Sequence, residues 1–194
     1  MKRIFCLISA FVFVLCLTGC NNNANKTDVS SETSPVQSTA TYSRENTNKD
    51  AELLFDNLNE IDMLGGSALE YDENDCFEEG RLTYCKVTDK KYTSVKQIKE
   101  FMEENLTENL IGGRYVTILG TEEPCFVEKD GNLYVLRAGR GCGFRYTEKP
   151  VVTQSNEKGF VAERKYDNFG IESTLRISVV LENEKPKIDS LEVI

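Results

Sequence analysis

The most unusual stretch of the chain runs from Gly139 to Tyr146 and combines glycine with arginine and aromatic residues. Glycine lets the backbone approach another molecule closely, and Arg, Phe and Tyr side chains often anchor interfaces. We therefore interpret the stretch as a candidate binding loop. The alternative is a β-bulge or a disulfide-clamped strand connection, whereas a phosphate-binding loop is excluded because no helical pattern follows the glycines. The residues of the candidate loop are Gly139, Arg140, Gly141, Gly143, Phe144, Arg145 and Tyr146.

The chain contains no histidine. Ser-His-Asp and Cys-His nucleophiles, His-ligated zinc and histidine general bases are therefore excluded. Carboxylate, lysine or tyrosine chemistry remains, but the sequence gives no way to choose two of its many carboxylates as an acid-base pair. We expect a protein that is not an enzyme and that carries no cofactor and no metal ion.

Four cysteines lie in the region that is expected to fold: Cys76, Cys85, Cys125 and Cys142. Outside the cytoplasm, an even number of cysteines predicts disulfides. Proximity in sequence favours pairing Cys76 with Cys85 and Cys125 with Cys142. The alternatives are free thiols or a four-thiolate zinc site, although the usual Cys-x-x-Cys knuckles are missing.

A run of acidic residues extends from Glu70 to Glu79. Such a run suggests calcium, but the EF-hand pattern is absent, because Phe77 occupies the position of the required glycine in a loop beginning at Asp72. We interpret the run as a solvated acidic loop.

The beginning of the chain predicts export and lipid attachment. Lys2 and Arg3 precede an apolar stretch, Ile4 to Leu17, which is followed by Thr18-Gly19-Cys20. A basic start, a short apolar centre and small residues before the cysteine are typical of a signal peptide with a lipobox, although a secretory peptide with a chance cysteine is the alternative. The pattern resembles bacterial lipoproteins, so we expect residues 1–19 to be removed. An acylated Cys20 would then hold the protein on the extracytoplasmic face of the cell membrane.

Residues 20–49 are mostly Asn, Ser, Thr, Lys and Glu, a composition that cannot bury a core and that predicts a disordered tether. Residues 50–194 suit a single domain, which we expect to be monomeric. The formal net charge of -9 argues against nucleic acid as a partner.

Helical segments are expected in the first half of this domain. Apolar residues recur at helical spacing over 50–64, before two glycines. A capping box of Ser94 and Gln97 predicts a second helix to residue 104. Thr107 is expected to cap a short helical turn that also ends at two glycines.

Strands follow the helices. One is expected over 80–88, and a hairpin is expected where Asp130-Gly131 separates 125–129 from 132–138. A long alternating run over 171–181 predicts a further hairpin that turns near Asn183-Glu184. This order favours an α+β fold, with helices packed on one curved antiparallel sheet in the manner of cystatin-like or NTF2-like domains.

The order of segments resembles the IseA family of peptidoglycan DL-endopeptidase inhibitors, over roughly residue 50 to the C-terminus. The family's members are non-catalytic proteins that block NlpC-type cysteine-histidine endopeptidases of the cell wall by docking a loop in the active-site cleft. The resemblance implies that this chain does the same, with Gly139–Tyr146 as the candidate loop. The segments that carry it are Tyr92–Lys99, Leu106-Thr107, Phe126–Val135, the glycine-rich loop and Leu181–Asp189.

A second hypothesis belongs to another functional class. A cystatin-like or NTF2-like lipoprotein would bind a small ligand or a wall fragment in the concavity of its sheet. A deep apolar pocket with converging polar groups would favour that hypothesis.

Overall fold

The computed structural model describes residues 44–120, 122–139 and 141–194. The expected signal peptide, the lipidation site Cys20 and most of the expected tether lie outside the described residues, as does Arg140 of the candidate loop. Within the described ranges, no helix is both long enough and apolar enough to cross a membrane.

The fold is α+β, as the sequence predicts, and its strands form antiparallel sheets. The helices are α1 (Arg44–Gly65), α2 (Val95–Asn105), α3 (Glu108–Gly113) and α4 (Val116–Leu119). The strands before residue 140 are β1 (Tyr71–Glu79), β2 (Leu82–Val87), β3 (Phe126–Lys129) and β4 (Asn132–Leu136). The later strands are β5 (Arg145–Tyr146), β6 (Val151–Asn156), β7 (Gly159–Asn168), β8 (Ile171–Glu182) and β9 (Lys185–Val193).

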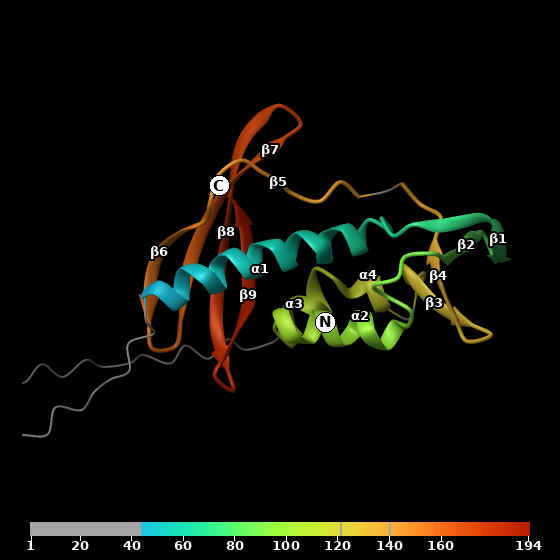
Figure 1. Ribbon diagram of the computed structural model, residues 1–194, viewed down its shortest axis with the longest axis horizontal. Helices are drawn as coiled ribbons and strands as arrows, with labels where there is room; N and C mark the ends of the chain where they lie inside the picture. The colour runs from blue at the N-terminus through green and yellow to red at the C-terminus, as the bar shows by residue number, and fades with distance from the viewer. Residues whose placement is uncertain (1–43, 121, 140) are drawn as a thin grey trace, which may run out of the picture. The chain divides into compact units, whose positions relative to one another are not determined.

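The described strands are divided between two sheets, where we expected one. The smaller sheet has the order β1-β2-β4-β3, and the larger has the order β5-β7-β8-β9, with β6 also paired to β7 (Figure 1). Alternation of apolar and polar residues predicts that a strand has one buried face, but it does not predict which strands pair. This alternation therefore could not predict that the strands form two sheets.

Helix α1 links these parts of the fold. It begins at Arg44, earlier than the predicted start at residue 50, and the side chain of Thr47 is only 1% exposed. The extra turn is polar, so apolar periodicity could not reveal it. In Figure 1, α1 runs from the larger sheet toward the smaller one, and its apolar side is buried along its length. The buried residues of α1 include Ala51, Leu54, Phe55, Leu58, Ile61 and Leu64.

The predicted helix starts after α1 are confirmed. The Ser94 hydroxyl accepts a hydrogen bond from the backbone N–H of Gln97 (3.2 Å), at the start of α2. The Thr107 hydroxyl accepts one from Leu110 (3.4 Å), at the start of α3. Thr107 also donates its backbone N–H to the carbonyl of Ile188 (2.9 Å), which joins the α2–α3 connection to β9.

Two predicted hairpins are also confirmed. Strands β3 and β4 turn at Asp130-Gly131, and β8 and β9 turn at Asn183-Glu184. The first residue of each turn has a positive φ, which Asp and Asn tolerate better than most residues.

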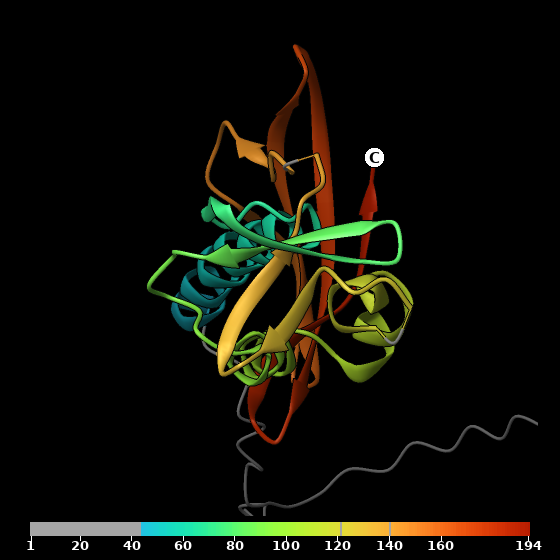
Figure 2. The same ribbon diagram turned by 90° about the vertical axis from the view of Figure 1, so that its right-hand side faces the viewer.

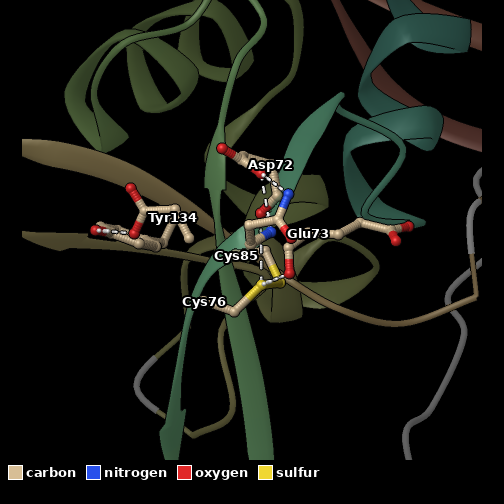
Figure 3. Close-up of a disulfide and its surroundings, with 7 residues drawn as sticks. Asp72, Glu73, Cys76, Cys85 and Tyr134 are labelled. Carbon is tan, nitrogen blue, oxygen red and sulfur yellow. Dashed lines mark hydrogen bonds between the residues drawn. A yellow bond between two sulfur atoms is a disulfide. The ribbon is translucent and has the colours of Figure 1, made fainter.

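The interpretation of residues 70–79 as an acidic loop is wrong. Most of the run forms β1, an antiparallel partner of β2, and Cys76 lies opposite Cys85 in the pairing. Figure 3 shows the disulfide between these two cysteines, close to Asp72 and Glu73. Acidic residues have low strand propensity, but pairing with β2 and the disulfide outweigh it at this exposed edge.

Candidate functional site

Only part of the expected disulfide pairing is present. Cys76 and Cys85 are bonded, as favoured by their proximity in sequence, whereas Cys125 and Cys142 are free thiols. Cys125 is buried, with its Sγ 3.6 Å from the carbonyl oxygen of Gly65, and Cys142 is exposed. The predicted pairing of Cys125 with Cys142 is therefore wrong, because one thiol faces the core and the other faces solvent.

The described part of the candidate loop is fastened to the end of α1. The backbone N–H of Gly141 donates to the carbonyl of Gly66 at 2.8 Å. The two backbones are so close that a Cβ added to Gly66 would lie 2.2 Å from the Cα of Gly141. The side chain of Asn59 in α1 accepts a further hydrogen bond from the backbone N–H of Phe144. Glycine at positions 66 and 141 thus permits the loop to lie directly on the helix.

Both aromatic residues of the loop face inward. Phe144 packs edge-on against Tyr166 of β7, with ring centroids 5.3 Å apart, and stacks on Tyr146 at 5.8 Å. Tyr146 contacts Phe55 of α1 edge-on, and its hydroxyl donates to the Phe55 carbonyl at 3.1 Å. Phe144 and Tyr146 are partly buried against the core, so they hold the loop in place instead of presenting it to a partner.

Arg164 of β7 completes this inner contact. Its guanidinium lies 4.1 Å from the centroid of the Tyr146 ring and forms an ion pair with Asp56 of α1 at 2.8 Å. The Arg164 side chain is only 13% exposed, so its cation–π contact is largely shielded from water. Burial raises the pKa of the Tyr146 phenol well above its ordinary value, which keeps the phenol neutral.

Arg145 points the other way. Its side chain is 82% exposed, and its guanidinium meets the carboxylate of Asp167 at 3.2 Å across the β5–β7 pair. Alternation along β5 explains the difference from its neighbours, because successive side chains of a strand project to opposite faces. Of the predicted loop residues that the structure describes, Arg145 has the side chain available for a partner.

A cleft of about 260 Å³ lies beside Arg145. Its walls are formed by Asp62 of α1, by the loop from Cys142 to Arg145, and by residues 166–169 at the end of β7 and in the following turn. Burial raises the pKa of the Asp62 carboxyl, and the positive charge of Arg114 partly opposes this effect. We call this cleft and the exposed residues that border it the loop–turn site.

A larger pocket of about 360 Å³ lies along α1 near residues 89–92. Three side chains that line it are already paired with one another, because the carboxylate of Glu60 accepts from both Lys91 Nζ and the Tyr92 hydroxyl. A ligand would have to replace these contacts. The exposed side chain of Arg145 makes the loop–turn site the better candidate for contact with a partner.

Comparison with known proteins returns no matching family model, curated protein or solved structure. Among residues 44–120, 122–139 and 141–194, no group of three or more acidic or cysteine side chains is arranged to hold a metal ion.

Several residues of the loop–turn site were missed by reasoning from the sequence. Asp167 and Phe169 lie at and just beyond the end of β7, a strand that pairs with the candidate loop although it follows it by some twenty residues. The residues Asn168-Phe169-Gly170 lie between two runs in which apolar and polar residues alternate. This pattern could have predicted the turn. Asn59 and Arg164 gave no such signal, because their roles depend on tertiary contacts.

Proposed function

We propose that this chain is a membrane-anchored lipoprotein that inhibits NlpC-type DL-endopeptidases of the cell wall by inserting the exposed residues of the loop–turn site into their active-site cleft. The proposal combines the family resemblance with the expected lipid on Cys20. In this account the inhibitor performs no chemistry, which agrees with a chain that lacks histidine.

The observation that carries the proposal is the way the loop is held. Its backbone is hydrogen-bonded to Asn59 of α1 and to Gly66, the residue after α1, and both of its aromatic rings are packed inward, while Arg145 is left 82% exposed. A contact surface that is already ordered loses little conformational entropy on binding, which favours tight occlusion of a cleft. Exposed arginine is also among the commonest anchors of interfaces.

The expected lipid would add a second advantage. Attachment at Cys20 would keep the inhibitor close to the membrane, near the wall that these endopeptidases cut. Tethering raises the effective concentration of a binding partner without any new contact.

The test is release of soluble peptides from purified cell wall by an NlpC-type endopeptidase, with increasing amounts of the unlipidated chain from Cys20 onward. We expect dose-dependent suppression that is complete near equimolar amounts. No effect on several such enzymes, by a chain shown to be folded, would contradict the proposal.

Arg145→Ala is the variant that connects inhibition to the site. Its ion pair with Asp167 is exposed, so losing it should cost little stability, about 0–1 kcal/mol. We expect weaker inhibition by Arg145→Ala and unchanged inhibition by Arg81→Ala, a matched change at an exposed arginine in the β1–β2 turn. Phe144→Ala is a poorer test because that ring packs against Tyr166.

A further inference from the structure

The turn between β7 and β8 holds an exposed phenylalanine in a backbone conformation that phenylalanine rarely adopts. Asn168 pairs with Ile171, so Phe169 and Gly170 are the two central residues of the turn, with φ of 53° and 89°. Two positive φ values define the hairpin turn that prefers Asn-Gly or Asp-Gly. The Phe169 side chain is 89% exposed, so core packing does not explain why this residue stands there.

Two other hairpins of the same chain provide a comparison. The first turn residue is Asp130 in the β3–β4 turn (φ 51°) and Asn183 in the β8–β9 turn (φ 51°). Asp and Asn tolerate positive φ because their short polar side chains bond locally to the backbone. Phe169 occupies the equivalent position of the β7–β8 turn. It has no short polar side chain to bond to the backbone, and its aromatic ring is exposed to water.

The turn is linked to the candidate loop through Asp167. One carboxylate oxygen of Asp167 accepts the backbone N–H of Gly170 at 2.5 Å, and the other meets Arg145 at 3.2 Å. Phe169 and Arg145 therefore border the same cleft in a defined arrangement. Figures 1 and 2 both show the tip of the β7–β8 hairpin projecting beyond the neighbouring strands, as a convex feature that a concave surface could receive.

We infer that Phe169 is an anchor of the loop–turn site that fills an apolar subsite in the active-site cleft of the endopeptidase, beside the contact made by Arg145. The inference rests on the proposed function and deepens it, since it names the chemistry that the partner must present. An aromatic ring on a protruding turn has few rotatable bonds, so it loses little side-chain entropy on binding and buries a large apolar area. Ile171, the first residue of β8 after the turn, is a second exposed apolar side chain, at 68%.

The test uses Phe169→Asn in the unlipidated chain from Cys20 onward. Asparagine suits the positive φ, so this variant should fold at least as well as the original chain, with a melting temperature about 2–4 °C higher. The same substitution should weaken inhibition of the endopeptidase by about tenfold or more, because it removes an aromatic anchor. A gain in stability together with a loss of inhibition is the predicted signature.

Two controls separate the anchor from general effects. Asn183→Phe creates the same strained arrangement in the β8–β9 turn and should lower the melting temperature without changing inhibition. Leu53→Ala removes an apolar side chain of α1 that is 58% exposed and should leave inhibition unchanged.

The outcomes distinguish the anchor from the proposed function. Inhibition by the original chain and equal inhibition by Phe169→Asn would overturn the role of Phe169 alone. Equal loss of inhibition in Leu53→Ala would also overturn it, because the effect would then not be specific to the turn. No inhibition by the original chain would overturn the proposed function and the anchor with it.

Discussion

At the scale of single residues, Asp62 is the ionisable group of the loop–turn site whose pKa is shifted by burial. Because burial raises its pKa, the charged carboxylate is less stable in the folded chain than in the unfolded chain. This penalty is fully present above the raised pKa and disappears as the pH falls through it toward the ordinary value of 3.8. Asp62→Asn should therefore increase the free energy of unfolding at pH 7, and the gain should shrink in acid.

Urea unfolding of Asp62→Asn at pH 7 and near pH 4 measures this effect. Glu73→Gln is the control, since it removes the same charge from an exposed side chain in β1. An Asp62→Asn variant that is less stable than the original chain at pH 7 would show that attraction to Arg114 outweighs the cost of burial.

The candidate loop shows what could be predicted about individual residues. Its composition identified the stretch that contributes to the loop–turn site, but it suggested Phe144 and Tyr146 as exposed anchors, whereas both are packed inward. Alternation across Phe144-Arg145-Tyr146 already separates the arginine from the two rings, so this distinction was available in the sequence. The sequence did not show which of the two sides would face the core, because this depends on the contacts with Tyr166 and Arg164.

At the scale of secondary-structure elements, the contact between α1 and the loop depends on Gly66. A methyl group there would lie 2.2 Å from the Cα of Gly141, a separation that forces backbone to move. Gly66→Ala should lower the free energy of unfolding by about 1–3 kcal/mol. Gly112→Ala in α3 meets nothing within 4 Å and should instead be neutral or stabilising by about 0.5–1 kcal/mol.

Chemical denaturation of the two glycine variants tests this contact. Both substitutions add the same methyl group, but only Gly112 lies within a helix, where alanine is favoured over glycine by about 0.5–1 kcal/mol. A loss of stability in Gly66→Ala beyond that difference measures the steric effect. Equal stabilities for Gly66→Ala and Gly112→Ala would mean that the loop moves away from α1 at no cost, and the description of a firmly held loop would be wrong.

Elements with strong local signals were predicted correctly. The helix caps at Ser94 and Thr107 and the turns at Asp130-Gly131 and Asn183-Glu184 all form as expected, since each depends on residues close in sequence. Strand β1 was missed because its acidic residues give no alternating pattern and its conformation depends on pairing with β2. The same limit applies to β5, a two-residue strand that exists through its contact with β7.

At the scale of the whole molecule, two segments that are distant in the sequence meet at one site. The candidate loop and the turn after β7 are joined through Arg145 and Asp167, and the loop is also hydrogen-bonded to Asn59 of α1 and to Gly66, which follows α1. This arrangement explains why the sequence identified one half of the site and not the other. Local composition marks a loop, but only the pairing of β5 with β7 brings the turn beside it.

The central claim is that this chain occupies the active-site cleft of an NlpC-type endopeptidase, and the most direct measurement is the accessibility of that enzyme's catalytic cysteine. The rate of alkylation of this cysteine by a small thiol reagent would be measured with increasing amounts of the unlipidated chain from Cys20 onward. We predict that alkylation slows as the chain is added and nearly stops at saturation, with Phe169→Asn and Arg145→Ala protecting less well. An alkylation rate that stays constant at saturating concentrations of folded chain would contradict the claim.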